Sequence, residues 1–333
     1  MTIAPLAITL GDPAGIGPEL LLKAWRARET KRLPAFFAVA DPTLLSHRAQ
    51  ALGLGIAIET STPESASAIF ERALPVTPLT RTTQPVAAGR PDVSNAPAII
   101  ESIERAVACV ANGSARAVVT NPIAKSVLYA AGFAHPGHTE FLGELARQNY
   151  GAPCRAVMML WARELAVVPI TIHIPLSEAP RKLTRELIIE TATIVARDMA
   201  GRFGIAQPRL AFSGLNPHAG EDGALGREEI DVMAPALAVL RETGIDARGP
   251  FPADTLFHAA ARAGYDVALC PTHDQALIPI KTLAFERGVN VTLGLPFVRT
   301  SPDHGTAFDI ADKGVADPTS LIEAIRLADR MTS

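Results

Sequence analysis

Short apolar runs alternate with segments of helical periodicity along this 333-residue chain, and this alternation constrains the fold more than any other feature. The runs expected to form buried strands are residues 6–10, 35–40, 117–120, 158–161, 166–174, 210–212 and 266–270. Helices are expected between them, among others at residues 20–28, 99–110 and 184–203. Such alternation predicts an α/β fold with mostly parallel sheets flanked by helices. Residues 60–97, rich in Pro, Thr and Ser, are expected to connect these elements with little regular structure.

Length and composition narrow the class of protein. A chain of 333 residues is too long for one ordinary core and suits two lobes. Lys and Arg number 31 against 34 Asp and Glu, with no basic stripe, so nucleic acid is not an expected partner. The apolar run 3–10 is too short for a signal peptide or a membrane span. Three scattered cysteines fit a reducing cytoplasm and argue against a cysteine-based metal site.

A glycine-rich turn, residues 11–19, follows the first expected strand and leads into a helix. Strand, glycine-rich turn and helix is an arrangement that can direct backbone N–H groups at an anion or a cofactor. The turn has neither the GxGxxG pattern nor the lysine of a phosphate-binding loop. On its residues alone, a tight connection is at least as plausible as a phosphate cradle.

Many polar side chains gather in the apolar segment 273–311. They include Lys281 in an apolar run, Asn290 and Arg299, with histidines at 273 and 304. Because burying unpaired polar groups is costly, so many of them indicate a functional site. Upstream, His138 and Thr139 precede an expected helix. Thr139 is the expected N-cap, and His138 would lie at the positive end of the helix, where an anion can bind.

Three histidines lie at or just past expected strand ends in separate strand–helix units. His173 falls in the run 166–174, whereas His218 and His273 each follow a strand. A single histidine in a strand is more often a core residue, but ligands of open α/β sheets bind at the carboxyl ends of strands. Three imidazoles with open positions suit Zn, Co or Mn, so the set as a whole predicts a metal site.

Motifs that span the chain in order resemble those of the 4-hydroxythreonine-4-phosphate dehydrogenase family. They are GDPAGIGPE at 11–19, GHTE at 137–140, GLNPHAGEDGALGREE at 214–229, GPFPADTLF at 249–257, HDQ at 273–275 and GLPFVRTSPDHGTAFDIA at 294–311. Pro271 and Thr272 depart from the Met-Tyr pair common in the family but leave HDQ intact. The resemblance implies an enzyme of pyridoxal phosphate biosynthesis. It also implies a two-lobed fold of the isocitrate/isopropylmalate dehydrogenase type and a homodimer with its active site at the interface.

The resemblance also assigns residues to roles. The metal ligands would be His173, His218 and His273, at least one of them supplied across the dimer, and the metal would be Zn, Mg or Co. The substrate-binding residues would be His138, Thr139, Lys281, Asn290 and Arg299. The turn at 11–19 and the loop at 304–311 are similar to the superfamily's NAD-binding stretches. The residues expected to bind NAD, or NADP, are Asp12, Gly15, Gly17, His304, Gly305, Thr306 and Asp309.

The implied reaction oxidises the C3 hydroxyl of 4-phosphooxy-L-threonine, passes hydride to NAD and gives a β-keto acid. This acid decarboxylates to 3-amino-2-oxopropyl phosphate. A divalent metal lowers the pKa of an alcohol that it binds and polarises a carbonyl, which explains a histidine site in a dehydrogenase. Lys281, Arg299 and the helix start at His138 would hold the phosphate and carboxylate. Asp254, Asp274 and Lys281 are the candidate catalytic residues, and Asp274 could instead support a histidine ligand.

Other functions stay open on the sequence. A paralogue that oxidises 4-phospho-threonate or 4-phospho-erythronate would share these motifs. A phosphate acyltransferase of the same fold would need neither the three histidines nor the 304–311 loop, and a non-catalytic binding protein would need no metal site. By analogy with related dehydrogenases, residues 1–130 and 290–333 are expected to form an NAD-binding lobe. Residues 131–289 are expected to carry the metal ligands and the dimer contact.

Overall fold

The computed structural model describes residues 3–135, 137–151 and 153–333, and the chain divides into two compact units. Unit 1 combines residues 1–156 with 295–333, and unit 2 is residues 157–294. The first boundary lies beyond the expected one at residue 130, because the helix α7 (His138–Tyr150) packs its Leu142 and Leu145 into the core of unit 1. The second boundary lies close to the expected one.

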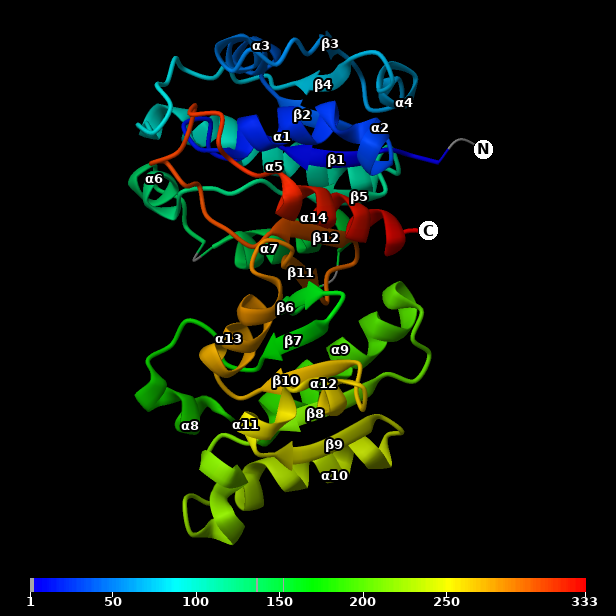
Figure 1. Cartoon of the computed structure of the whole chain (residues 1–333), viewed down its shortest axis with the longest axis vertical. Helices are drawn as coiled ribbons and strands as arrows, with labels where there is room; N and C mark the ends of the chain where they lie inside the picture. The colour runs from blue at the N-terminus through cyan, green and yellow to red at the C-terminus, as the bar shows by residue number, and fades with distance from the viewer. Residues whose placement is uncertain (1–2, 136, 152) are drawn as a thin grey trace. The chain divides into compact units, whose positions relative to one another are not determined.

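Unit 1 contains a parallel sheet whose described strands follow the order β3-β4-β2-β1-β5-β12. The bounds are β1 Leu6–Thr9, β2 Phe36–Ala40, β3 Ile58–Thr60, β4 Leu74–Pro78, β5 Ala117–Val119 and β12 Val298–Pro302. All residues of β1 and β2 are buried, as expected for parallel strands covered on both faces. The chain thus returns after unit 2 to add β12 beside β5 (Figure 1).

Helices cover this sheet. Their bounds are α1 Gly17–Arg26, α2 Arg28–Lys31, α3 Pro42–Ala51, α4 Ala66–Ile69, α5 Ala96–Ala111, α6 Lys125–Ala130, α7 as above and α14 Thr319–Arg330, with a 3₁₀ turn η1 at Val93–Asn95. The C-terminal helix α14 packs against β12, β5 and α1, and α5 packs against β1, β2 and α7 (Figure 1). Ser102 of α5 accepts a hydrogen bond from the Leu10 N–H (2.9 Å) and donates one to the Val39 carbonyl (2.6 Å). This contact fixes the start of the glycine-rich turn.

Unit 2 contains a mixed sheet in the order β11-β6-β7-β10-β8-β9. The strands are β6 Val157–Ala162, β7 Leu165–Pro169, β8 Arg209–Ser213, β9 Asp246–Phe251, β10 Val267–Cys270 and β11 Val289–Leu293. The pairs β11–β6 and β6–β7 are antiparallel, and the other pairs are parallel. The predicted α/β fold with mostly parallel sheets flanked by helices is therefore confirmed.

The helices of unit 2 are short apart from α9 and α13. Their bounds are α8 Ala179–Lys182, α9 Arg185–Phe203, α10 Ala234–Glu242, α11 Ala253–Leu256, α12 Ala259–Arg262 and α13 His273–Ala284, with helical turns η2 Leu176–Glu178, η3 Pro217–Gly223 and η4 Glu229–Met233. The helix α13 packs against β6, β7 and β10, and α9 packs against β6 and β11 (Figure 1). Thr184 caps α9 through its side chain, and Gly204 ends it in a left-handed conformation, close to the expected range 184–203.

Two of the expectations about strands are wrong. Residues 60–97 are expected to lack regular structure, yet β4 lies between β3 and β2 within the sheet. The sequence does not predict this strand because it contains Pro75 and Pro78, and proline is unusual inside a sheet. The run 166–174 is a strand only as far as Pro169, and His173 lies beyond it in a left-handed conformation with φ 50°.

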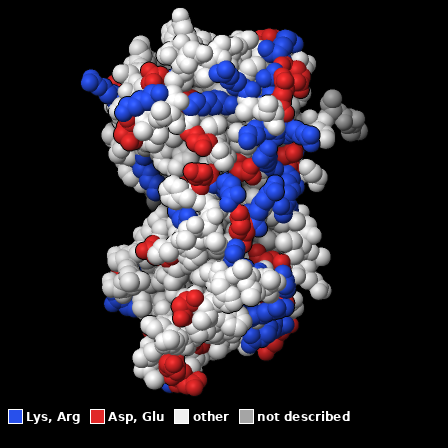
Figure 2. Space-filling model, viewed as in Figure 1, with Lys and Arg blue, Asp and Glu red and all other residues white. Residues whose placement is uncertain are grey.

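The distribution of surface charge and the hydropathy of the helices agree with what the composition predicts. On the face drawn in Figure 2, basic and acidic side chains are interspersed and form no single-sign region. Within the described ranges, no helix combines the length and apolar character needed to cross a membrane.

Candidate active site

A buried arginine lies at the centre of the candidate site in unit 1. Arg299 of β12 is only 4% exposed, and its Nε and Nη2 atoms donate to the Thr120 hydroxyl at 3.1 and 2.6 Å. The contact follows from strand register, because β12 pairs with β5 and Thr120 directly follows β5. Burial lowers the pKa of Arg299 to about 10, which still leaves it a cation at neutral pH.

His138 lies at the start of α7, close to this arginine. The helix begins at His138 after Gly137, so the expectation that Thr139 caps it is wrong; Thr139 is its second residue. Burial, followed by the charges of Arg299 and Lys125, holds the pKa of His138 well below its ordinary value of 6.5. Its Nε2 atom is buried and has no hydrogen-bond partner. His138 is therefore a neutral imidazole with a ring nitrogen available to a ligand.

Lys125 joins this group, although no role is predicted for it from the sequence. It is the first residue of α6, and a Cβ atom on Gly137 would lie 3.3 Å from its Nζ. The ammonium thus lies beside the N-terminus of α7, where the helix carries partial positive charge. Lys125, Arg299 and this helix end form a positive region suited to phosphate or carboxylate. The only sign of this role in the sequence is that Lys125 follows shortly after the end of an expected strand.

Two unsatisfied polar atoms lie near the end of β1, one in the glycine-rich turn and one just after β5. The Asp12 N–H donates to the Pro122 carbonyl (2.9 Å), and Asp12 Oδ1 accepts from the Ala14 N–H (2.9 Å). Burial raises the pKa of Asp12, and the bond from Ala14 offsets part of this rise. Asp12 Oδ2 and Asn121 Oδ1 are buried and have no partner. Such orphaned acceptors are expected where a ligand supplies hydroxyl or amide donors.

The other predicted cofactor stretch contacts this turn directly. The Ile16 N–H donates to the Thr306 carbonyl (3.0 Å), and a Cβ atom on Gly15 would lie 2.9 Å from that oxygen. His304 Nδ1 lies 3.0 Å from the Gly305 carbonyl, and its Nε2 is buried without a partner. Unit 1 therefore brings the two predicted stretches together, and the close approach requires glycine at position 15. The orphaned atoms fit a bound dinucleotide, whose binding there stays a prediction.

A cavity of about 750 Å³ in unit 2 gathers four of the predicted residues. Its lining includes His173, His273, Asp254 and Asp274. The rings of His173 and His273 have centroids 5.6 Å apart. His273 Nδ1 lies 2.8 Å from Asp274 Oδ1, a contact that would orient the ring and leave Nε2 for a metal. This geometry favours Asp274 as a support for His273 and leaves Asp254 as the candidate base.

His218 does not line this cavity. It lies after β8 on a loop in which residues 218–222 all have positive φ, and its side chain is exposed. The buried carboxylate of Glu229 anchors the loop by accepting hydrogen bonds from the Asn216 N–H (2.8 Å) and Nδ2 (2.9 Å). Among the described residues, no group of three or more His, Cys, Asp or Glu is arranged to hold a metal. The imidazole pair suits a divalent ion in donor type, but the third ligand is not assembled.

The two remaining predicted residues belong to unit 2. Lys281 lies in the last turn of α13 with its Nζ 5.5 Å from the centre of the Phe285 ring, and Asn290 lies in β11, paired with Leu160. Neither lines the cavity of unit 2. The predicted substrate set is thus divided between His138, Thr139 and Arg299 in unit 1 and these two residues in unit 2.

Comparisons with known proteins agree with the resemblance in the motifs. The family described as "Pyridoxal phosphate biosynthetic protein PdxA" matches residues 32–328. The chain belongs to the PdxA family. A relative named 4-hydroxythreonine-4-phosphate dehydrogenase from Methylorubrum extorquens is 60% identical over 328 residues, covering 98% of this chain and 94% of the relative. A relative of the same name from Bradyrhizobium diazoefficiens is 58% identical over 339 residues, covering 99% and 97%.

Solved structures of the PdxA family extend the similarity to three dimensions. The crystal structure of 4-hydroxythreonine-4-phosphate dehydrogenase from Klebsiella pneumoniae is 35% identical, with a TM-score of 0.85. The match covers 99% of this chain and 100% of that one. Similarity to the PdxA family therefore extends over both units.

The neutral state of His138 predicts a pH effect on stability. Because its folded pKa lies below the unfolded value, the unfolded chain binds the extra proton as the pH falls below about 6.5. Stability should drop there, by at most about 1.4 kcal/mol per pH unit. His138→Gln should reduce this drop, as measured by thermal unfolding between pH 7.5 and 5, with exposed His47→Gln as comparison. An unchanged slope in His138→Gln would contradict the neutral assignment.

Proposed function

We propose that this chain is a 4-hydroxythreonine-4-phosphate dehydrogenase that oxidises 4-phosphooxy-L-threonine in pyridoxal phosphate biosynthesis. The observation that carries the proposal is the positive region of Arg299, Lys125 and the α7 N-terminus, in a member of the PdxA family. A substrate with a phosphate at one end and a carboxylate at the other suits such a region. The names of the relatives favour this function over 4-phospho-threonate or 4-phospho-erythronate oxidation.

The groups of unit 1 would bind and orient the substrate. Arg299 is held by Thr120 and offers a planar set of N–H donors that matches phosphate or carboxylate. Neutral His138 can donate or accept a hydrogen bond at Nε2 without adding charge. Lys281 and Asn290 of unit 2 are proposed as further substrate residues. The double-ended anion then binds in one orientation, with its C3 hydroxyl directed to the hydride acceptor.

A dehydrogenase of the PdxA family needs an NAD(P)-type hydride acceptor, and we propose NAD, with NADP as a second acceptor. Its residues would be those of the turn at 11–19 and of the stretch 304–309. The support is their direct contact and the unpartnered Asp12 Oδ2 and His304 Nε2. Glu19 strengthens the arrangement, because its buried carboxylate accepts the Ala316 N–H (3.1 Å) and pairs with Lys23 (2.7 Å).

The proposed metal ligands are His173, His218 and His273. When bound, a divalent ion would supply Lewis-acid chemistry, lowering the pKa of the substrate hydroxyl and stabilising charge as carbon dioxide leaves. Imidazole donors favour Zn or Co over Mg. Asp274 would hold the His273 ring, and Asp254 would take the hydroxyl proton. His218 would have to reach the other two ligands by a change of its loop or from a partner subunit.

The proposed assembly is a homodimer in contact through unit 2, in the cytoplasm. Ile278 on α13 is 64% exposed, and Phe285, the residue that follows the end of α13, is 74% exposed. Leu176 and Leu283 are also exposed. Several exposed apolar side chains on and beside one helix are typical of a protein contact. The cysteines of the described chain form no disulfide, in keeping with a reducing compartment.

Substrate turnover tests the proposed reaction. NADH formation, with divalent metal added, should be faster from 4-phosphooxy-L-threonine than from 4-phospho-erythronate or 4-phospho-threonate. We expect kcat/KM to differ by about 100-fold, since the pocket would be built for the substrate's polar groups. Unphosphorylated 4-hydroxy-L-threonine tests the role of the phosphate. Faster oxidation of either phospho-sugar acid would assign the chain to the paralogous reaction.

Histidine substitutions test the metal site. His173→Ala, His218→Ala and His273→Ala should each lose bound metal and lower kcat by more than about 100-fold, since changes near a metal alone cost 10- to 100-fold. Exposed His258→Ala in the same unit is the matched control. Metal content by mass spectrometry and folding by circular dichroism accompany the rates. A variant that keeps full metal and rate would remove that histidine from the site.

Charge introduced on α13 tests the dimer. Ile278→Asp combined with Phe285→Asp should shift the protein from dimer to monomer in sedimentation, and activity should fall with it, since a shared site needs both subunits. Ile3→Asp, at an exposed apolar residue of unit 1, controls for added charge. A wild-type monomer with full activity would rule out a site shared between subunits.

A further inference from the structure

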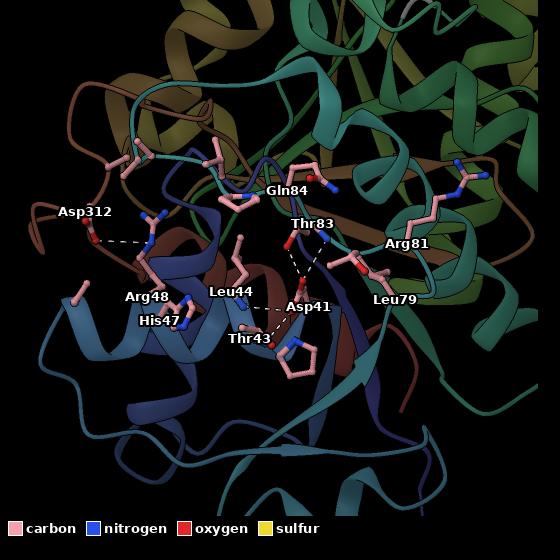
Figure 3. Close-up of a pocket in the computed structure, with 18 residues that line it drawn as sticks. Asp41, Thr43, Leu44, His47, Arg48, Leu79, Arg81, Thr83, Gln84 and Asp312 are labelled. Atoms are coloured by element: carbon pink, nitrogen blue, oxygen red, sulfur yellow. Dashed lines mark hydrogen bonds and ion pairs between the residues drawn. The ribbon is translucent and has the colours of Figure 1, made fainter.

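Unit 1 contains a cavity of about 920 Å³ that the proposed function has not used. Its walls are α3, residues 79–88 and residues 311–312 (Figure 3). Segments that directly follow β2 and β4, at their carboxyl ends, line it. Ligands of parallel α/β sheets bind at this edge.

The cavity adjoins both predicted cofactor stretches. Arg48 Nη2, in its wall, donates to the Pro13 carbonyl of the glycine-rich turn (3.1 Å). The Gly89 N–H, one residue past another wall segment, donates to the Ala14 carbonyl (2.8 Å), and a Cβ atom there would lie 2.7 Å from the Phe308 carbonyl oxygen. Ala311, at the end of the stretch similar to the adenosine loop, itself lines the cavity. The cavity is therefore a continuation of the proposed adenosine site.

An ion pair between a buried arginine and an exposed aspartate lies at one end of this cavity. The Arg48 side chain is only 7% exposed, and its Nε is 3.7 Å from Oδ1 of Asp312, which is 40% exposed. Arg48 Nη1 is buried and has no hydrogen-bond partner. Figure 3 shows Arg48 beside Asp312, with Arg81 at the opposite side of the cavity. A buried guanidinium with an unmatched N–H is costly, so an acceptor from a ligand would relieve it.

The other carboxylate in the wall is already occupied. Asp41 accepts hydrogen bonds from the N–H groups of Thr43 (2.8 Å) and Leu44 (3.3 Å), which cap α3. It also accepts from the N–H (3.3 Å) and hydroxyl (2.6 Å) of Thr83. Asp41 therefore shapes the cavity, and the charged groups with capacity for a ligand at the Ala311 end are Arg48 and Asp312.

We propose that this cavity receives the adenosine end of the dinucleotide and that Arg48 and Asp312 together recognise the 2′ position of its ribose. Asp312 accepts a hydrogen bond from the 2′-hydroxyl of NAD, and Arg48 binds the 2′-phosphate of NADP. The inference rests on the proposed NAD(P)-dependent function. A carboxylate alone would repel a 2′-phosphate and an arginine alone would attract it. The pair predicts an enzyme that binds both cofactors and discriminates weakly between them.

A purely structural role for Arg48 is the competing explanation. Its contacts with the Pro13 carbonyl and Asp312 would hold the turn against the loop. Loss of that support would weaken binding of every adenosine ligand equally. Loss of a 2′-phosphate contact would weaken only ligands that carry this phosphate, so nucleotide fragments separate the two roles.

The test is calorimetric binding of 2′,5′-ADP and 5′-AMP to the intact protein without substrate. Arg48→Gln should weaken the binding of 2′,5′-ADP by about 10- to 100-fold, because a charge-assisted contact is lost. It should weaken the binding of 5′-AMP by less than about 3-fold. Asp312→Asn, at a part-exposed side chain that tolerates substitution, should shift the preference several-fold toward 2′,5′-ADP by removing like-charge repulsion. Arg72→Gln, at an exposed arginine of the same unit, should change neither the affinity for 2′,5′-ADP nor the affinity for 5′-AMP.

Equal weakening of both fragments by Arg48→Gln, or an unchanged preference in Asp312→Asn, would overturn the inference. So would failure of the wild-type protein to bind either fragment. The ratio of kcat/KM for NADP and NAD should follow the same direction in the variants. Fragment binding as expected without oxidation of 4-phosphooxy-L-threonine would refute the proposed reaction and leave the cofactor inference standing.

Discussion

The burial of Arg299 against Thr120 is the interaction on which the candidate site depends. Placing a guanidinium in the interior costs free energy, as the depressed pKa of Arg299 indicates, and the structure retains it by matching β12 to β5 in register. The same charge keeps His138 neutral, after the larger effect of burial on that pKa. A cation held this firmly is ready to bind an anion without first losing side-chain freedom, which favours tight binding.

The return of the chain to unit 1 makes this arrangement possible. Arg299 comes from the last strand of the chain and Thr120 from the middle of unit 1, so the site forms only when residues 295–333 join the N-terminal segment. Buried Glu19 makes the same connection at the proposed cofactor site, where it accepts the Ala316 N–H. Both proposed binding functions of unit 1 thus depend on pairing between segments far apart in sequence. Loosening either contact should affect ligand binding before it affects the core.

The sequence predicts the elements of regular pattern well and the irregular ones poorly. The helix α9, Arg185–Phe203, lies within one residue of the expected range 184–203, because the residues that end it are local. The sequence does not predict the strand β4, because Pro75 and Pro78 are unusual in a sheet and its pairing with β3 and β2 is not a local pattern. The extent of unit 1 differs from the expected one because the attachment of α7 is a packing contact without a local sequence pattern.

The candidate site shows the same division. Motif resemblance singles out Arg299 and His138, but the role of Lys125 depends on its approach to Gly137, which the sequence does not encode locally. The histidines are expected at strand ends, yet His173 and His218 lie in loops and have left-handed backbone conformations. No periodicity in the sequence predicts the paths of these loops. The proximity of His173 and His273 follows from the placement of those loops and of α13.

The most direct test of this account is the affinity for 4-phosphooxy-L-threonine when Arg299 is changed. The central claim is that buried Arg299 binds one of the substrate's two anionic groups. Calorimetry should show that Arg299→Gln weakens binding of this ligand by about 30-fold or more, since truncating a buried charge contact costs about 2 kcal/mol or more. Exposed Arg72→Gln should bind it as the wild-type protein does. Unchanged affinity in a folded Arg299→Gln protein would contradict the account.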